Sequence, residues 1–322
     1  MQKIIPYSIE KDFIEFEKQY VSIFQNKHRS VDEILHHLIT THGKCLRPML
    51  VLLSAGMSGK INRNTYLIAT IIELLHISSL VHDDVIDNAS YRRNQPTLNA
   101  LWSNKISVLT GDYLISKCLQ VLCEINDPLL FNYISDLVNH MSEGELIQLS
   151  KINDYSLTDE EYYLIIQSKT ADLFGACMYL GAYSSGASKE DLKCLECIGK
   201  EVGTAFQIND DLKDYNINLK DKDFAKDIKE RIVTLPLIHA MRKMDEAQKQ
   251  TLMQLYGKED KSDDIICQII NTVKQHDGLL YAHEIIRQKV KHALLLLEKC
   301  KDSIYKESLR EIIQQLSPEE HL

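Results

Sequence analysis

Apolar residues recur at three- and four-residue spacing through most of this 322-residue chain. This spacing places them on one face of an α-helix and predicts long amphipathic helices. Glycine and proline, which turn-rich folds need, number only 12 and 6. That scarcity excludes a β-sandwich or barrel, so the predicted class is all-α, a helical bundle. Helices are expected at Ile9–Phe24, Val31–Ile39, Pro48–Ala55, Tyr66–Asp87, Val108–Ile125, Leu129–Leu149, Asp159–Gly181, Lys189–Tyr215, Leu235–Tyr256 and Gly278–Cys300.

The chain shows no low-complexity linker and no fixed-period repeat, so we expect one domain over residues 1–322. Thr158 and Glu161 have the form of a capping box at a helix start. The polar segment Asn216–Glu230 is interpreted as a long loop. The formal net charge of −9, without any lysine-rich block, argues against a nucleic-acid partner.

The cysteines indicate a reducing compartment. Eight are spread through apolar stretches, and the one close pair, Cys194 and Cys197, lacks the companions of a metal site. Free thiols without a signal peptide favour the cytoplasm. The most membrane-like run, Tyr66–Val81, contains Glu73 and His76, so we interpret it as a buried core helix and expect no membrane span.

Two aspartate triplets end apolar helices. The first lies in LVHDDVIDNASYRR at 80–93 and the second in FQINDDLKDY at 206–215. Because residues four apart share a helical face, each triplet gathers carboxylate oxygens on one face. A single triplet is more typical of a solvated acidic face, but two of them indicate cation binding. Hard oxygen ligands without clustered cysteines suit Mg²⁺, which shares its coordination with phosphate oxygens and water. The triplets are Asp83, Asp84 and Asp87, and Asp210, Asp211 and Asp214.

Basic residues near these triplets fit phosphate groups. Arg92 and Arg93 follow the first triplet, Lys44 and Arg47 stand three apart before an apolar helix, and Lys169 begins another. Each is weak evidence alone, because exposed lysine and arginine are common. Together they offer the guanidinium forks and point charges that a diphosphate needs.

With these motifs the sequence resembles the trans-polyprenyl diphosphate synthases over essentially its whole length. The matching segments are GKCLRP at 43–48, HDDVID with RR, GDYL at 111–114, SEGELIQL at 142–149, KTADL at 169–173, FQINDDLKDY and TLPLI at 234–238. The resemblance implies an isoprenoid-synthase helical bundle around a central substrate cavity. It also implies a Mg²⁺-dependent head-to-tail condensation of an allylic prenyl diphosphate with isopentenyl diphosphate, and a homodimer.

The resemblance also implies roles for individual residues. The metal ligands would be Asp83, Asp84, Asp87, Asp210 and Asp214, with Asp211 alongside. Arg92, Lys169 and Lys222 would hold the allylic diphosphate, and Lys44, Arg47, His76 and Arg93 would hold isopentenyl diphosphate. Thr170 and Gln207 would face the developing cation, where an oxygen stabilises positive charge.

The sequence departs from the family pattern at three places. Cys45 stands where a second basic residue is frequent, the loop around Lys222 lacks glycines, and Ile232 replaces a lysine before TLPLI. The last two departures lie in the segment that would close over the second triplet. All six aspartates remain, which argues against a subunit that has lost its metal sites.

Two rival functions stay open at this point. A di-iron carboxylate bundle needs an ExxH motif from two helices plus two further glutamates. The chain has ExxH at Glu33–His36 and Glu73–His76, but this function leaves both triplets unused. The other rival is a regulatory subunit of a heteromeric synthase, which the activity of the chain alone would exclude.

Product length depends on the residues before the first triplet. A growing tail would pass Ser78, Leu75 and Ile71, which form one helical stripe. Relatives with short products carry an aromatic residue where this chain has the small Ser78 and Ser79. Since each helical turn opens about 5.4 Å, we expect a medium- or long-chain product of about C25 to C50, suited to a quinone side chain. The alternatives are a short C15–C20 product of about three or four isoprene units, or serines that merely pack a helix contact.

Overall fold

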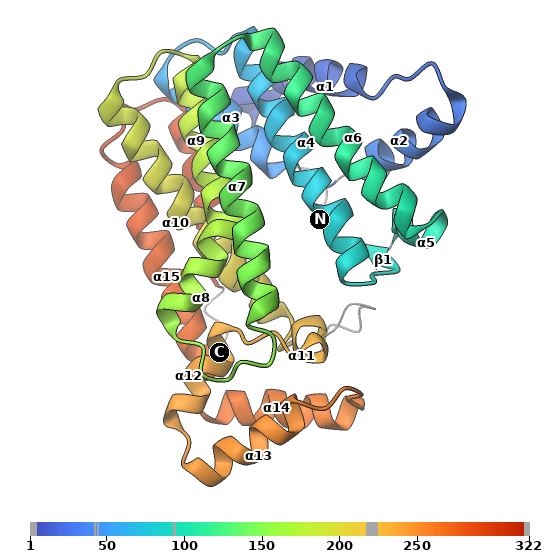
Figure 1. Ribbon diagram of the computed structural model, residues 1–322. Helices are drawn as coiled ribbons and strands as arrows, with labels where there is room; N and C mark the ends of the chain where they lie inside the picture. The colour runs from blue at the N-terminus through green and yellow to red at the C-terminus, as the bar shows by residue number, and fades with distance from the viewer. Residues whose placement is uncertain (1–4, 42, 44, 93–94, 217–224, 319–322) are drawn as a thin grey trace. The chain divides into compact units, whose positions relative to one another are not determined.

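The computed structural model describes residues 5–41, 43, 45–92, 95–216 and 225–318 (Figure 1). These residues are almost entirely helical, which confirms the all-α class. Within them the only strands are β1 (Tyr91–Arg92) and β2 (Gln95–Pro96), an antiparallel pair. The helices are η1 Tyr7–Ile9, α1 Glu10–Ile23, α2 Arg29–Thr41, α3 Leu46–Ser58, α4 Arg63–Ile86, α5 Leu98–Leu101, α6 Asn104–Ile125, α7 Pro128–Ser150, α8 Asp159–Ile166, η2 Gln167–Ala171, α9 Asp172–Ser184, α10 Lys189–Lys213, α11 Lys226–Glu230, α12 Leu235–Lys243, α13 Glu246–Tyr256, α14 Asp263–Gln275, α15 Gly278–Leu297 and α16 Ile304–Gln314.

The chain forms two compact units. Unit 1 comprises Met1–Val138, Phe174–Glu196 and Leu297–Arg310, and unit 2 comprises Asn139–Leu173, Cys197–Leu296 and Glu311–Leu322. The first aspartate triplet belongs to unit 1 and the second to unit 2. The expectation of a single domain over 1–322 stays a prediction.

Helix α4 is the core helix of unit 1. A capping box between Asn62 and Thr65 starts it, and Asp87 is its C-cap. It packs along α6 and against α3 and α1 (Figure 1). Burial of Leu67, Ile71 and their neighbours accounts for its continuous apolar sequence, as expected for Tyr66–Val81. Two described helices, α4 and α6, have the length and composition to cross a membrane, and 72% of the apolar window of α4 is buried inside the protein.

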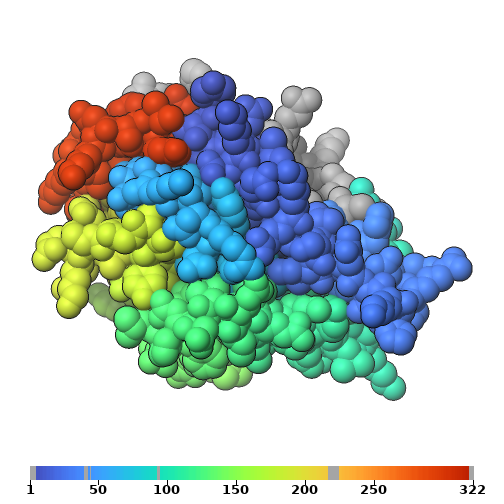
Figure 2. Space-filling model, turned by 90° about the horizontal axis from the view of Figure 1, so that it is seen from above, coloured from blue at the N-terminus to red at the C-terminus, as the bar shows by residue number. Residues whose placement is uncertain are grey.

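Segments far apart in the sequence complete unit 1. The hydroxyls of Ser8 and Ser308 lie 2.7 Å apart, and the Asn62 amide donates to the carbonyl of Ser184 at 2.7 Å. In Figure 2 the dark-blue N-terminal segment accordingly lies beside the red C-terminal one. Because Asn62 is the N-cap of α4, the second contact lies where α4 begins.

Unit 2 contains α8, η2 and the C-terminal half of α10. The predicted capping box is confirmed, since Thr158 accepts from the Glu161 amide and Glu161 accepts in return. Helix α8 then runs into η2, a π-helical segment, before α9 begins. Farther along the chain, α12 and α13 both pack against α14.

Several expected boundaries are wrong. The helix expected over Leu235–Tyr256 is split at Met244, because Asp245 caps α13 in a capping box with Gln248. The helix expected over Asp159–Gly181 is interrupted by η2. Of the loop expected over Asn216–Glu230, residues 217–224 lie outside the described residues, and α11 occupies Lys226–Glu230. Additional described elements are β1, β2, α5, α14 and α16.

Candidate active site

The first triplet occupies the C-terminal end of α4. Asp83 and Asp84 lie in its last turn, and the backbone N–H of Asp87 donates to the Asp83 carbonyl at 2.8 Å. Asp84 is buried, while Asp83 and Asp87 are half-buried. The predicted sharing of one helix end by three carboxylates is therefore present in the fold.

The β1–β2 hairpin brings Arg92 back to this triplet. The Arg92 Nε donates to Asp84 Oδ1 at 2.8 Å. The hairpin is fastened by Thr97, whose hydroxyl donates to the carbonyl of Ala89 at 2.7 Å, and by Asn99, whose amide donates to the same carbonyl at 2.9 Å. Asp84 thus orients Arg92, and a guanidinium is fixed beside the acidic end of α4.

Arg47 and His76 meet in unit 1 as the expected binding residues for one substrate. Arg47, in the first turn of α3, has its Nη1 2.9 Å from His76 Nε2 and its guanidinium 4.9 Å above the Phe174 ring. A guanidinium only donates, so His76 Nε2 accepts and the imidazole proton resides on Nδ1. Cys45, one of the departures from the family pattern, is buried at the N-cap of α3 with a left-handed φ of 53°.

The second triplet lies at the C-terminal end of α10. Asp211 is buried, Asp214 is half-buried and Asp210 is exposed. Burial, followed by repulsion from Asp227 of α11, raises the pKa of both Asp211 and Asp214. The backbone N–H of Asp227 donates to an Asp214 oxygen. Four acidic groups therefore crowd one place and favour a bound cation.

The π-helical segment η2 places Thr170 beside α10 and Lys169 beside α7. The Thr170 hydroxyl is 2.7 Å from Gln207 Oε1, so the structure brings these two expected residues together. The Lys169 ammonium is 2.9 Å from Glu145 of α7. Such π-helical turns occur frequently at functional sites. Gly144 permits the approach of α7, because a Cβ there would lie 2.8 Å from the Ser168 Cβ.

The chain-length residues follow the side of α4 that meets α6. The buried Ser78 donates to the Gly111 carbonyl of α6 at 3.0 Å, and the Cys118 thiol of α6 lies 3.8 Å from the Ile71 carbonyl. Leu75 is buried on the same stripe. Ser79 donates instead to the His76 carbonyl of its own helix at 2.9 Å. Ser78 thus packs a helix contact, and the tunnel along this stripe stays a prediction.

Lys44, Arg93 and Lys222 lie outside the described residues. Among the described ones, no set of three or more histidine, cysteine, aspartate or glutamate side chains is arranged to hold a metal ion alone. Mg²⁺ keeps several waters and takes one or two carboxylates together with substrate phosphates, so it does not require such a set. The all-oxygen, partly buried carboxylates at both helix ends fit that ion.

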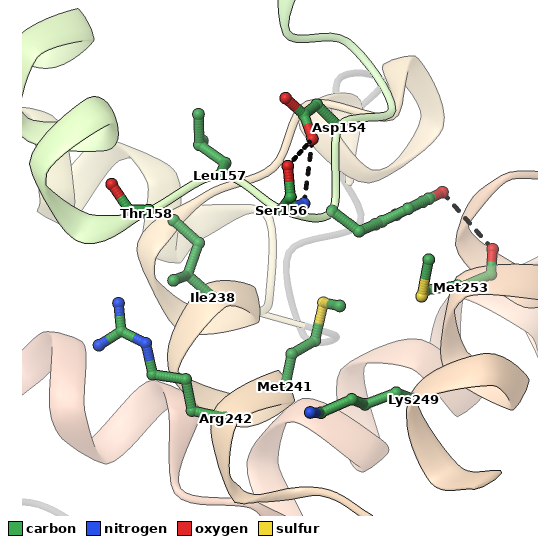
Figure 3. A pocket seen from close by; sticks show the side chains of 10 residues that line it. Asp154, Ser156, Leu157, Thr158, Ile238, Met241, Arg242, Lys249 and Met253 are labelled. Carbon is green, nitrogen blue, oxygen red and sulfur yellow. Dashed lines mark hydrogen bonds between the residues drawn. The ribbon is translucent and has the colours of Figure 1, made fainter. Parts of the chain in front are cut away.

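A cavity of about 550 Å³ lies elsewhere in unit 2 (Figure 3). The expected site residues do not line it. On its rim, Arg242 of α12 contacts both carboxylate oxygens of Asp159 at 2.7 Å, and Thr158 caps α8. The N-terminal end of α8 therefore forms part of the cavity lining.

Four residues of these surroundings were not expected from the sequence: Tyr162, Glu145, Asp227 and Gly144. Tyr162 donates to Asp211 Oδ2 at 2.6 Å. Its position in the first turn after the Thr158 capping box is visible in the sequence, but its partner 49 residues away is not. Asp227 fell in a segment interpreted as loop.

Known proteins identify the family. The polyprenyl synthetase family pattern matches residues 28–273. An octaprenyl diphosphate synthase of Haemophilus influenzae is 31% identical over 281 residues, 87% of this chain and 85% of that one. A short chain isoprenyl diphosphate synthase of Methanothermobacter thermautotrophicus is 31% identical over 291 residues, 88% of this chain and 89% of that one. The crystal structure of a polyprenyl synthase from Caulobacter crescentus, complexed with calcium and isoprenyl diphosphate, matches with a TM-score of 0.91 and 25% identity, covering 97% of this chain and 96% of that one.

The protein is therefore an enzyme of the helical isoprenoid-synthase class, a prenyltransferase. The chain belongs to the polyprenyl synthetase family, and the expected trans-polyprenyl diphosphate synthase is confirmed. The di-iron rival finds no support, because Glu33 pairs with Arg29 at 3.0 Å and His76 is bonded to Arg47.

Proposed function

We propose that this protein catalyses the Mg²⁺-dependent condensation of an allylic prenyl diphosphate with isopentenyl diphosphate. The observation that carries the proposal is the crowding of Asp211 and Asp214 with Asp227 at one helix end, where burial and then repulsion from Asp227 raise the pKa of both triplet carboxyl groups. Negative charge on buried or half-buried carboxyl groups is stable only beside cations. In a polyprenyl synthetase, the metal ions bound to the substrate diphosphate would supply these cations.

The residues divide into three proposed groups. Mg²⁺, when bound, would neutralise the leaving diphosphate, with Asp83, Asp84, Asp87, Asp210 and Asp214 as its ligands. Arg92, Lys169 and Lys222 bind the allylic diphosphate, and Lys44, Arg47, His76 and Arg93 bind isopentenyl diphosphate. Thr170 and Gln207 direct oxygen lone pairs at the positive charge that develops as the carbon–oxygen bond breaks.

The chain's own groups contribute orientation and charge. Arg92, fixed by Asp84, presents its remaining N–H groups to phosphate oxygens. Arg47 is held by His76 and by the Phe174 ring, so little side-chain entropy is lost when it binds an anion. The apolar faces of the helices keep water from the allylic cation, which the double bond of isopentenyl diphosphate then attacks.

The proposed product is a medium- or long-chain all-trans polyprenyl diphosphate of about C25 to C50, with one turn of α4 for each added unit. A quinone side chain is the proposed destination of a tail of that length. The small side chains of Ser78 and Ser79 support this proposal. The relative named as a short chain synthase keeps a product of about C15 to C20 as the alternative, again counted at one unit per turn.

Purified protein tests the reaction directly. The chain alone, given both diphosphates and Mg²⁺, is expected to release inorganic diphosphate, and chelation by EDTA abolishes the release. Asp83→Asn and Asp210→Asn each lower turnover by about a hundredfold or more, the scale of lost transition-state charge stabilisation. Asp136→Asn, at an exposed carboxylate of α7, is the matched control. Full turnover in either triplet variant contradicts the assignment, and an inactive chain points instead to a regulatory subunit.

We also propose a homodimer in the cytoplasm. Helix α6 exposes Val108, Leu109 and Leu119, with Leu109 67% exposed. Apolar side chains gathered on one helix are stabilised when a second copy covers them. The described part of unit 1 thus offers α6 as the face that pairs.

A further inference from the structure

A chain of hydrogen bonds connects α8, η2 and α10 within unit 2. The Tyr162 hydroxyl lies 2.6 Å from Asp211 Oδ2, and Gln207 Nε2 lies 2.8 Å from Asp211 Oδ1. Gln207 Oε1 lies 2.7 Å from the Thr170 hydroxyl. Tyr162, Asp211 and Thr170 are all buried, so water does not compete freely for these bonds.

The direction of each bond follows from the chemistry of its partners. A carboxylate only accepts, so Tyr162 and the Gln207 amide nitrogen both donate to Asp211. The Gln207 oxygen must then face Thr170 and accept from its hydroxyl. The Thr170 oxygen, having given its proton to this bond, keeps both lone pairs for other partners. A hydroxyl oxygen in that state stabilises positive charge.

Asp211 is therefore the group that sets this polarity. Both of its oxygens serve neighbouring side chains, which separates its role from that of the exposed Asp210 in the same triplet. Without the Tyr162 bond, the Asp211 carboxylate is free to rotate, and the Gln207 amide loses the partner that fixes its orientation. Tyr162 is the one member of the chain of bonds that comes from α8.

We propose that Tyr162 is a positioning residue of the condensation. Its hydroxyl holds the Asp211 carboxylate in place, Asp211 fixes the Gln207 amide, and Gln207 keeps the lone pairs of Thr170 directed at the allylic cation. The proposal rests on the proposed function, since it deepens the role of Thr170 and Gln207 in that reaction. It also assigns a role to the π-helical segment η2, because η2 places the Thr170 hydroxyl within hydrogen-bond distance of Gln207 on α10.

Tyr162→Phe removes the hydroxyl and leaves the ring. A hydrogen bond to a charged group has an energy that corresponds to about a tenfold to hundredfold loss in kcat. The KM for isopentenyl diphosphate is expected to change by less than about twofold, because its proposed ligands Arg47 and His76 are not part of the hydrogen-bond chain. Tyr163→Phe is the matched control: it is the neighbouring tyrosine on α8, its ring lies 6.0 Å from the Lys289 ammonium, and its hydroxyl has no hydrogen bond in the described part of the chain.

A double-mutant cycle separates positioning from general destabilisation. In a Gln207→Leu background the path from Tyr162 to Thr170 is already broken, so adding Tyr162→Phe is expected to lower kcat by less than about threefold. An equal loss in both backgrounds overturns the proposal, as does a wild-type kcat for Tyr162→Phe alone. Should Tyr162→Phe fail to fold, the isosteric Asp211→Asn carries the test, and its retention of the wild-type kcat overturns the proposal equally. Absence of diphosphate release by the wild-type chain is a different outcome, which refutes the proposed function itself.

Discussion

Gly144→Ala should lower catalysis in a protein that still folds. A Cβ at position 144 would lie 2.8 Å from the Ser168 Cβ, 3.0 Å from the Lys169 nitrogen and 3.3 Å from the Ser168 carbonyl carbon. Ordinary contacts begin near 3.4 Å, so the closest pair must separate by 3.4 − 2.8 = 0.6 Å. Two of the three atoms are backbone of η2, which cannot rotate away. The π-helical segment itself therefore has to shift.

A shift of η2 also moves Thr170, which is proposed to face the developing cation. Thr170 is two residues beyond Ser168, and a misplacement of about 1 Å costs about a hundredfold in rate, so a shift of about half that size predicts about a tenfold loss in kcat. Overpacking costs about 1–3 kcal/mol, whereas alanine gains about 1 kcal/mol over glycine within a helix. The net loss of unfolding free energy is then at most about 2 kcal/mol.

Steady-state diphosphate release at saturating substrate, compared with thermal unfolding, tests this prediction. Glu143→Ala, at the exposed neighbouring position on α7, is the control and should leave kcat unchanged within about twofold. A Gly144→Ala protein with the wild-type kcat refutes the reasoning. So does a loss of activity that only follows the fraction of unfolded protein at the assay temperature.

Two further changes address unit 1. Gly181→Ala should lower the free energy of unfolding by about 1–3 kcal/mol in a thermal or urea melt, because its Cβ would meet Ser54 Oγ at 2.1 Å and the Val51 carbonyl at 2.2 Å; an unchanged melt contradicts that contact between α9 and α3. Leu109→Glu should convert the proposed dimer to a monomer in light scattering at micromolar concentration, because it puts a charge in the apolar face of α6. A dimer that persists places the interface elsewhere, and a wild-type monomer with full activity contradicts the dimer itself.

Periodicity predicted most of the helices because their apolar faces are buried along their whole length, as in α4. It could not locate breaks that depend on local polar bonds. Asp245 ends one apolar run by capping the next helix, and η2 interrupts another without any glycine or proline. Helices α14 and α16 are only 13 and 11 residues long, and α14 packs against α12 and α13. Their stability thus comes from tertiary contacts that the sequence alone does not reveal.

In the candidate site too, features set by local helix geometry were predicted, whereas features set by tertiary contacts were not. Spacing alone placed Asp83, Asp84 and Asp87 at one helix end, because the geometry of a helix is local. The contact of Arg92 with Asp84 depends on the β1–β2 hairpin, which hydrophobic periodicity does not predict. The contact of Tyr162 with Asp211 depends on the packing of α8 beside α10. The expected nearness of Thr170 and Gln207 came from the resemblance to a family and is present in the fold.

The structure also sharpens the test of product length, because the two serines before the first triplet differ in their contacts. Ser78 donates to the Gly111 carbonyl of α6, whereas Ser79 donates to its own helix. A phenylalanine at 78 must separate α4 from α6 and should lower the free energy of unfolding by about 1–3 kcal/mol. A change in product length in that variant could then come from the altered helix packing and not from a blocked tunnel. Ser79→Phe leaves that contact intact, and it should shorten the product while the first condensation and the melting temperature stay near those of the wild type.

Chromatography of the dephosphorylated products gives the result. Ser22→Phe is the control, because Ser22 is likewise bonded to its own helix, at the carbonyl of Gln19, but lies exposed on α1. A wild-type enzyme that stops at a product of about C15 or C20 refutes the open tunnel, since the small serines would then leave about two turns of α4 unused. An unchanged long product from Ser79→Phe, with Ser78→Phe also unchanged, shows that the tail does not run along α4.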